Sequence, residues 1–147
     1  MPDEASIEAL RAAVQAIVPA LESHPGGAEL GVEHHVAQAI EQAFPGFVDL
    51  IAILLDAYAP DVRPGATFLQ LTLEERGEVF RLMTNGETQD LRDAIDAVLV
   101  FTYGGMYSEW TGYLRATREL RPPDVWQRVG YHGPVAGVPD YRPAPPA

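Results

Sequence analysis

The pair His34-His35, beside Glu33, is the first candidate for chemistry in this sequence, because imidazole and carboxylate groups are common metal ligands. Neighbouring residues on a helix point about 100° apart, so the two rings cannot hold one ion together. A glutamine, Gln38, stands four residues after His34, so the HExxH zinc pattern is absent. We interpret the pair as surface histidines on an acidic helix.

The other polar residues form no recognisable catalytic group. Acid–base catalysis needs carboxylates held in a cleft, whereas Asp49 and Asp56 share only the wet side of an otherwise apolar segment. The sequence has no GxSxG pattern, and Gly104-Gly105 follows no strand that would make it a dinucleotide loop. Cysteine is absent as well. We therefore predict no catalytic residue, no metal site and no cofactor in this chain.

The most distinctive feature is an aromatic group with arginines beside it. Tyr103, Tyr107 and Trp110 recur at helical spacing, and four of the ten basic residues lie between positions 115 and 128. Tyrosine, tryptophan and arginine are the preferred anchors of protein–protein contacts, and here they would form a basic patch on an acidic protein. Some of the rings are expected to pack inward as a core seam. The predicted partner-binding residues are Tyr107, Trp110, Arg115, Arg118, Trp126, Arg128, Tyr131 and His132.

Charge and hydropathy exclude several other functions. The 147 residues carry a formal charge of −11, which repels phosphate backbones and anionic lipid heads, so we expect no nucleic-acid partner. No stretch approaches the roughly 20 apolar residues of a membrane-spanning helix, so we expect no membrane insertion. The first residues are acidic, without a basic region and apolar leader. We expect a cytoplasmic chain as written, or a periplasmic one if a leader has been removed.

Apolar side chains repeat at helical spacing in five segments, and these segments are the elements that would position the residues above. We predict an all-α, five-helix bundle-like or orthogonal fold in a single compact domain over residues 1–120. Pro19 should end or kink the first helix, and Thr72 with Glu75 forms a capping box for the fourth. The third helix is apolar on most sides and is predicted to be central. The expected helices span residues 6–21, 28–44, 47–58, 72–85 and 88–114, the last bent at Gly104-Gly105.

Residues 121–147 differ from the rest of the chain. They contain seven of the thirteen prolines, so we predict a non-helical, extended arm that lies over the helices or over a partner.

Three stretches of the sequence resemble the gluconate 2-dehydrogenase subunit 3 family. The first joins Ala16-Ile-Val-Pro19 to Pro25-Gly-Gly-Ala-Glu-Leu-Gly-Val32, and the second is Phe68-Leu-Gln-Leu-Thr-Leu-Glu-Glu-Arg76. The third pairs Thr102-Tyr-Gly-Gly-Met-Tyr-Ser-Glu-Trp110 with Val125-Trp-Gln-Arg-Val-Gly-Tyr-His-Gly133. Their order and spacing carry the resemblance over roughly residues 7–133.

The resemblance implies a small helical subunit without a cofactor, which stabilises or escorts a large flavin-dependent dehydrogenase or oxidase. The FAD is then expected in that partner, whose substrates are sugars, sugar acids or other alcohols. Two alternatives stay open from the residues alone. A stand-alone small-molecule binding or enzymatic domain would use a pocket under the arm, with Tyr107, His132 or Asp56 as polar contacts. A self-associating module would close a two-fold dimer through the same apolar patch.

Overall fold

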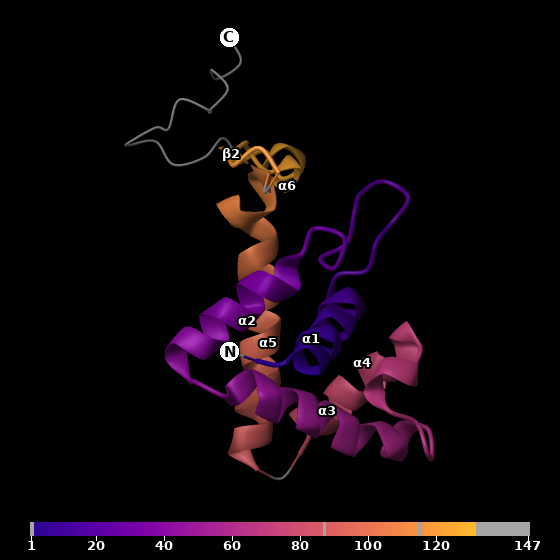
Figure 1. The fold of residues 1–147 in the computed structure, drawn as a ribbon. Coiled ribbons are helices and arrows are strands. Elements are labelled where there is room, and N and C mark those ends of the chain that lie inside the picture. The colour runs from indigo at the N-terminus through magenta and orange to yellow at the C-terminus, as the bar shows by residue number, and fades with distance from the viewer. Residues whose placement is uncertain (1, 87, 115, 132–147) are drawn as a thin grey trace.

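The computed structural model describes residues 2–86, 88–114 and 116–131, which form a mostly helical molecule (Figure 1). The predicted all-α class is confirmed. The long helices are α1 (Glu4–Ile17), α2 (Val32–Ala43), α3 (Phe47–Val62), α4 (Leu73–Thr84) and α5 (Gln89–Tyr107). The short elements are the 3-10 turns η1 (Phe68–Gln70) and η2 (Glu109–Gly112), the strands β1 (Tyr113–Leu114) and β2 (Glu119–Leu120), and the helix α6 (Asp124–Arg128).

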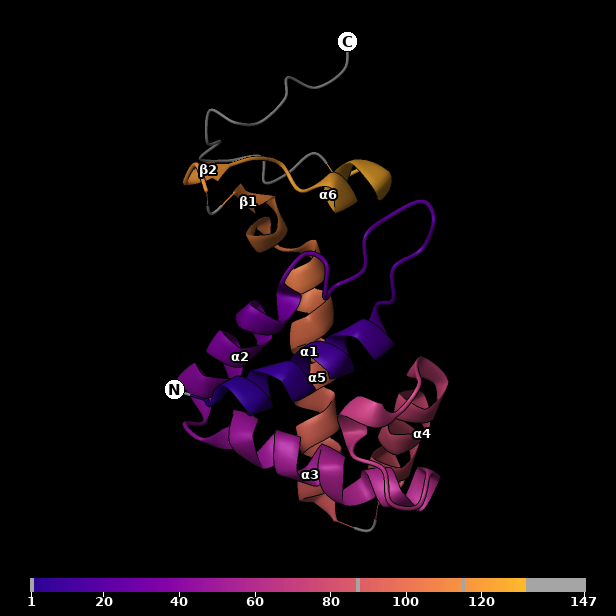
Figure 2. The ribbon, with the colours of Figure 1, turned by 45° about the vertical axis from the view of Figure 1, so that its right-hand side comes forward.

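Helix α5 is the column around which the other elements are arranged. In Figures 1 and 2, α3 and α4 lie at the level of its first turns, and α1 and α2 cross its middle. The β1–β2 hairpin and α6 lie beyond its last turn, with α6 in contact with it. The C-terminal elements therefore depend on α5 for their position.

Local sequence signals set several helix ends as predicted. Helix α1 begins after Asp3, whose carboxylate caps the first turn, and ends at Ile17, two residues before Pro19. Helix α4 begins with the predicted capping box. Thr72 Oγ1 accepts the Glu75 N–H at 3.2 Å, and the Glu75 carboxylate accepts the Thr72 N–H at 2.7 Å.

Other predicted boundaries are wrong. Helix α3 continues through Pro60 to Val62, because a proline near the C-terminal end removes only one hydrogen bond, and the Arg63 N–H still donates to Ala59 O at 3.0 Å. The segment after residue 120, predicted to be non-helical, contains the five-residue helix α6 directly after Pro123. A proline with its fixed φ is well suited to the start of a helix.

The last predicted helix is also shorter than expected. Instead of continuing to Leu114, α5 ends at Tyr107, because Ser108 turns out of the helix and its N–H and hydroxyl donate to Gly105 O at 3.2 and 2.8 Å. Trp110 therefore lies in η2, not on the helix face of Tyr103. The helix α5 continues through Gly104 and Gly105 to Tyr107, so the chain does not leave the helix at these glycines.

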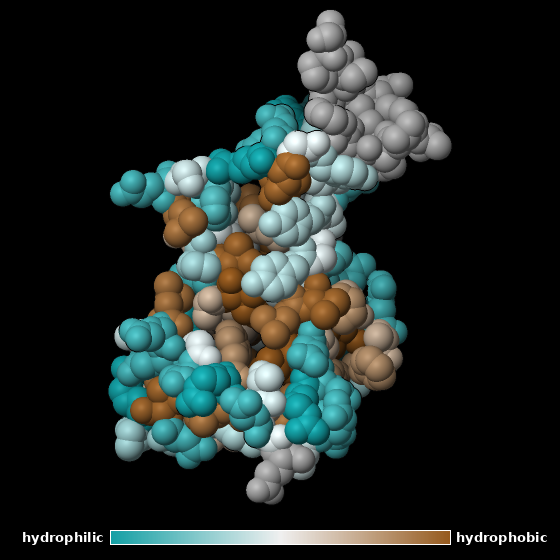
Figure 3. Space-filling model, turned by 180° about the vertical axis from the view of Figure 1, so that it is seen from behind, coloured by the Kyte–Doolittle hydropathy of each residue, from teal (hydrophilic) through white to brown (hydrophobic). Residues whose placement is uncertain are grey.

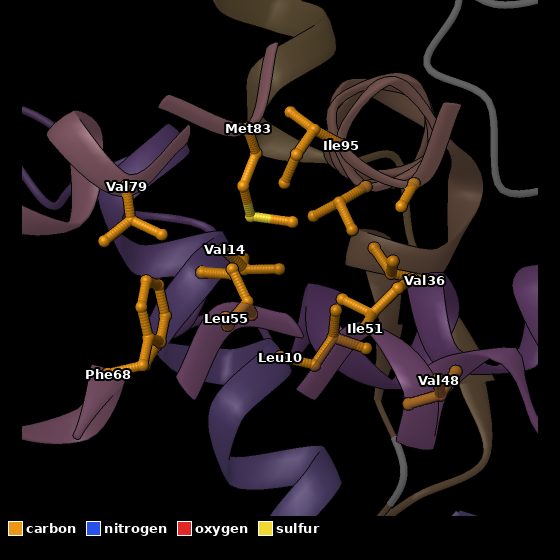
Figure 4. Packing of buried hydrophobic residues seen from close by; sticks show 14 of the residues in the cluster. Leu10, Val14, Val36, Val48, Ile51, Leu55, Phe68, Val79, Met83 and Ile95 are labelled. Carbon is orange, nitrogen blue, oxygen red and sulfur yellow. The ribbon is translucent and has the colours of Figure 1, made fainter. Parts of the chain in front are cut away.

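Buried apolar side chains from all five long helices form one core (Figure 4). Leu10 and Val14 of α1 lie among Leu55 of α3, Met83 of α4 and Ile95 of α5, and the five side chains point toward one another. Burial of such side chains is the main favourable term in folding.

The prediction that α3 is central is only partly correct. Val48, Ile51 and Leu55 are buried, but Leu50 is exposed and Ile53 is 64% exposed. The reason is that α3 lies along one side of α1, α2 and α4, so its opposite side has no helix over it in Figure 2.

Arg76 joins three elements from inside the core. Its guanidinium donates to Ala12 O of α1 at 3.4 Å and to the carbonyl oxygens of Phe68 and Leu69 in η1 at 3.3 and 3.1 Å. It also stands 5.7 Å from the centroid of the Phe68 ring. Burial lowers the pKa of Arg76, and no carboxylate pairs with it among the residues described. Phe68 and Arg76 are the first and last residues of the motif Phe68-Leu-Gln-Leu-Thr-Leu-Glu-Glu-Arg76. Together they connect α1, η1 and α4.

The helices α2 and α5 approach each other closely at Gly105. A Cβ atom there would lie 2.7 Å from His35 Cδ2 and 3.0 Å from Val32 Cγ1, so only glycine fits without movement of its neighbours. The neighbouring Gly104 is exposed, and a Cβ atom on it would meet nothing within 4 Å. The two glycines thus differ in what they do, although they stand side by side in the sequence.

This difference predicts opposite effects of the same substitution. Gly104→Ala should stabilise the protein by about 0.5–1 kcal/mol, because alanine is the better helix former. Gly105→Ala should destabilise it by about 1–2 kcal/mol, because overpacking against His35 and Val32 outweighs that gain. Urea unfolding followed by circular dichroism measures both variants. Equal effects of the two substitutions would contradict the close α2–α5 approach, and His35→Ala should relieve the cost of Gly105→Ala.

Candidate partner-binding surface

The helix α6 is held against the end of α5 by Trp126. Its indole is only 6% exposed, and its Nε1–H donates to Tyr107 O at 2.6 Å. The Tyr131 ring meets the Trp126 ring edge-on, with centroids 5.0 Å apart, and the Tyr131 N–H donates to Trp126 O at 2.8 Å. Trp126 therefore fixes the described part of the C-terminal segment to the helical body.

The β1–β2 hairpin leads the chain from η2 to α6. Its strands are antiparallel, with Tyr113 opposite Leu120, and the Arg121 N–H donates to Gly112 O at 2.9 Å. A Cβ atom on Gly112 would lie 1.8 Å from Arg121 O, so this crossing requires glycine. Arg118 turns the chain between the strands with a φ of 57°, in the left-handed region.

A groove of about 290 Å³ lies between the end of α5, the loop before α2, and α6. Its walls are mainly apolar, formed by Leu30, Met106 and Val125 among others. Tyr103 and Tyr107 line it from α5, and Arg128 lines it from α6.

Large apolar and aromatic side chains remain exposed around this groove. Tyr107 is 49% exposed, and Tyr103 and Val129 are exposed as well. Figure 3, seen from the side on which α5 lies, shows apolar surface between the helices and the C-terminal elements. We call the surface formed by Tyr103, Tyr107, Arg128 and Val129 the aromatic face. Isolated exposed apolar residues are ordinary, but a cluster around a groove is typical of an interaction site.

The aromatic face has one positive group, Arg128, and the groove beside it is also lined by the acidic Asp124. Arg118 and Arg128 are exposed and make no ion pair within the described part of the chain, whereas Arg121 pairs with Glu119 at 3.1 Å. Unpaired surface charges of this kind steer association with a surface of the opposite sign.

The structure places the predicted site residues in three different situations. Tyr107, Arg118, Arg128 and Tyr131 are exposed at the C-terminal end of the molecule. Trp126 is not an exposed anchor as predicted, because its indole fills the space beneath α6 and finds its hydrogen-bond acceptor there. Arg115 and His132 lie outside the described residues, and of Trp110 only the backbone is described.

The polar contacts expected for a small-molecule pocket do not gather in the groove. Tyr107 lines it, but Asp56 lies on α3, where its carboxylate accepts the Phe68 N–H at 2.8 Å. The Asp56 carboxylate thus fixes the start of η1 by a hydrogen bond, and the polar side of α3 positions that turn. The polar residues that do line the groove include His24 and Asp124. The sequence patterns did not indicate them, because both come from short segments without periodicity.

A second feature missed from the sequence is Glu33. Interpreted as part of an acidic helix surface, it is in fact 2% exposed, and its Oε2 has no hydrogen-bond partner in the part of the chain that the structure describes. His34 is exposed as predicted, whereas His35 is half-buried at the α2–α5 crossing, and burial lowers its pKa. Periodicity alone did not show that the first turn of α2 is covered.

A metal site and a membrane-spanning helix are two other features on which a function could depend. Among the described residues, no three His, Asp or Glu side chains come together as metal ligands. No single helix in those residues is long and apolar enough to cross a membrane; α2 and α3 pass that test only as a pair, bent by 117° between them.

No family model, no curated protein and no solved structure matches this chain.

Replacement of Trp126 tests how the C-terminal segment is held. Trp126→Phe should leave Tyr107 O without its donor and speed amide hydrogen exchange in α6 by about tenfold, because one buried hydrogen bond is lost. The free energy of unfolding of the helical body should change little, since Trp126 lies outside the main core cluster. Tyr131→Phe keeps the ring contact and serves as the control. Unchanged exchange in α6 of Trp126→Phe would contradict this anchoring role.

Proposed function

We propose that this chain is a non-catalytic small subunit that binds and stabilises a larger flavin-dependent sugar or alcohol dehydrogenase or oxidase. The observation that carries the proposal is the aromatic face. In it, an apolar groove is bordered by exposed tyrosines and by Arg128, which makes no ion pair among the described residues. Tyrosine and arginine around an apolar depression form the usual centre of a protein–protein interface. The class of partner comes from the sequence resemblance.

A protein partner explains this surface better than a small ligand does. The groove of about 290 Å³ is at the lower limit of ordinary ligand pockets, which begin near 300 Å³. A small molecule inside it would leave the outer parts of Tyr103, Tyr107 and Val129 in water. A protein surface would cover both the groove and its rim, and would remove more apolar area from water.

Charge also favours a particular side of the partner. Arg118 and Arg128 are exposed in a chain whose formal charge is −11. The partner is expected to present a carboxylate to Arg128 and an apolar projection to the groove. The FAD and the catalytic residues belong to the partner, and this chain contributes the contact surface.

The test is assembly with the flavoprotein encoded beside this chain. The two proteins are co-expressed and purified through a tag on this chain, and the visible spectrum and the subunit composition are recorded. We expect flavin absorbance and a second, larger subunit. The double substitution of Tyr103 and Tyr107 by serine should weaken assembly by about tenfold or more, because central tyrosines are common hot spots.

The control is a substitution on the other exposed apolar surface. Ile53→Ser changes a residue of α3 that is 64% exposed and far along the chain from the aromatic face. Assembly lost in Ile53→Ser but kept in the tyrosine variant would place the interface on α3 instead. A colourless product of 16.0 kDa alone, with soluble flavoprotein left in the lysate, would refute the subunit function.

A further inference from the structure

Glu33 is a buried acidic side chain with an unsatisfied oxygen among the described residues. It is 2% exposed, and its Oε2 makes no hydrogen bond among the described residues. Its Oε1 lies 3.6 Å from Nε2 of the exposed His34, which is beyond a normal hydrogen bond. A carboxylate removed from water in this way is costly unless a cation or several donors satisfy it. Its place in the first turn of α2 favours the negative charge, because that helix end carries a partial positive charge.

Glu33 lines a hollow of about 340 Å³ built from segments that are distant in the sequence. The loop before α2 contributes Glu29, and η2 and β1 contribute Thr111 and Tyr113. Arg11 of α1 lines it too. The hollow differs from the groove of the aromatic face because most of the groups around it are polar or charged.

We propose that this hollow binds a guanidinium group, with Glu33 as its counter-ion. A carboxylate can accept two parallel N–H bonds from a guanidinium, which would give Oε2 the partner that it lacks. Tyr113 is exposed and lines the same hollow, and an aromatic ring at such a site can stack on a planar cation. Glu29 adds a second negative charge beside the site.

The chain's own arginines are the competing occupants. Arg11 is exposed and makes no ion pair in the part of the chain described, although it lines the hollow. Arg115 lies outside the described residues. If either one neutralised Glu33, the hollow would be closed by an internal ion pair and would bind no added cation. The two cases predict opposite changes in stability, which makes them separable.

The test uses the full chain and needs no partner protein, so its result is independent of the proposed function. Phenylguanidinium is titrated into the ¹⁵N-labelled protein, and the amide shifts of residues 28–34 and 111–114 are followed. We expect saturable shifts with phenylguanidinium and none with phenylurea, its neutral counterpart. Glu33→Gln should weaken binding by about tenfold or more, because the charge-assisted bonds are lost. Glu29→Gln, which changes a carboxylate at the rim, should weaken it by about twofold or less.

Unfolding of the unliganded variants gives the second readout. Glu33→Gln should raise the urea midpoint, because it removes an unpaired buried charge. A lowered midpoint, matched by Arg11→Gln or Arg115→Gln without further loss in the double variant, would overturn the proposal in favour of an internal ion pair. Equal binding of phenylurea would overturn it as well.

A third titration distinguishes the two sources of such a group. Acetyl-arginine methylamide represents an arginine side chain of another protein. If it binds at least as well as phenylguanidinium, the site accepts a side chain; if only the small cation binds, the ligand is a free guanidine. Binding of either probe supports the site, and binding of neither refutes it.

Discussion

The close approach of α2 and α5 at Gly105 is the constraint on which the C-terminal half of the molecule depends. Without a side chain at this position, Val32 and His35 lie directly against the backbone of α5 and fix its direction. The last turn of α5 then presents the Tyr107 carbonyl to the Trp126 indole, which holds α6 in place. The groove, and with it the aromatic face, therefore follows from one helix crossing rather than from the short elements that form its outer wall.

Two buried charged residues, Arg76 and Glu33, differ in their hydrogen-bond partners within the described part of the chain. Arg76 lies inside the molecule, but carbonyl oxygens of α1 and η1 accept its N–H groups, so it serves the structure. Glu33 is less exposed still, and its Oε2 has no hydrogen-bond donor among the described residues. A protein of marginal stability tolerates an unsatisfied buried carboxylate at a cost, and such strain is more often found at binding sites than in structural cores.

The sequence predicted what depends on local periodicity and failed where distant segments meet. The spacing of apolar residues gave five helices, Pro19 marked the end of α1, and Thr72 with Glu75 marked the start of α4. The five-residue α6 is too short to show a helical period, and the end of α5 at Tyr107 depends on Ser108 bonding back to Gly105. The burial of Glu33 and Trp126 is visible only in the folded chain, where Thr111 lies beside the first and the Tyr107 carbonyl accepts a hydrogen bond from the second.

The apolar groove and the hollow of Glu33 share a wall. Leu30 and Thr111 line both the apolar groove and the hollow of Glu33, so the loop before α2 and the η2 turn separate one from the other. A cation bound at Glu33 would contact this wall from one side, and a partner bound in the groove would contact it from the other. If both proposed sites are occupied, the groove would contribute buried apolar area and the Glu33 carboxylate would contribute selectivity for a positive charge.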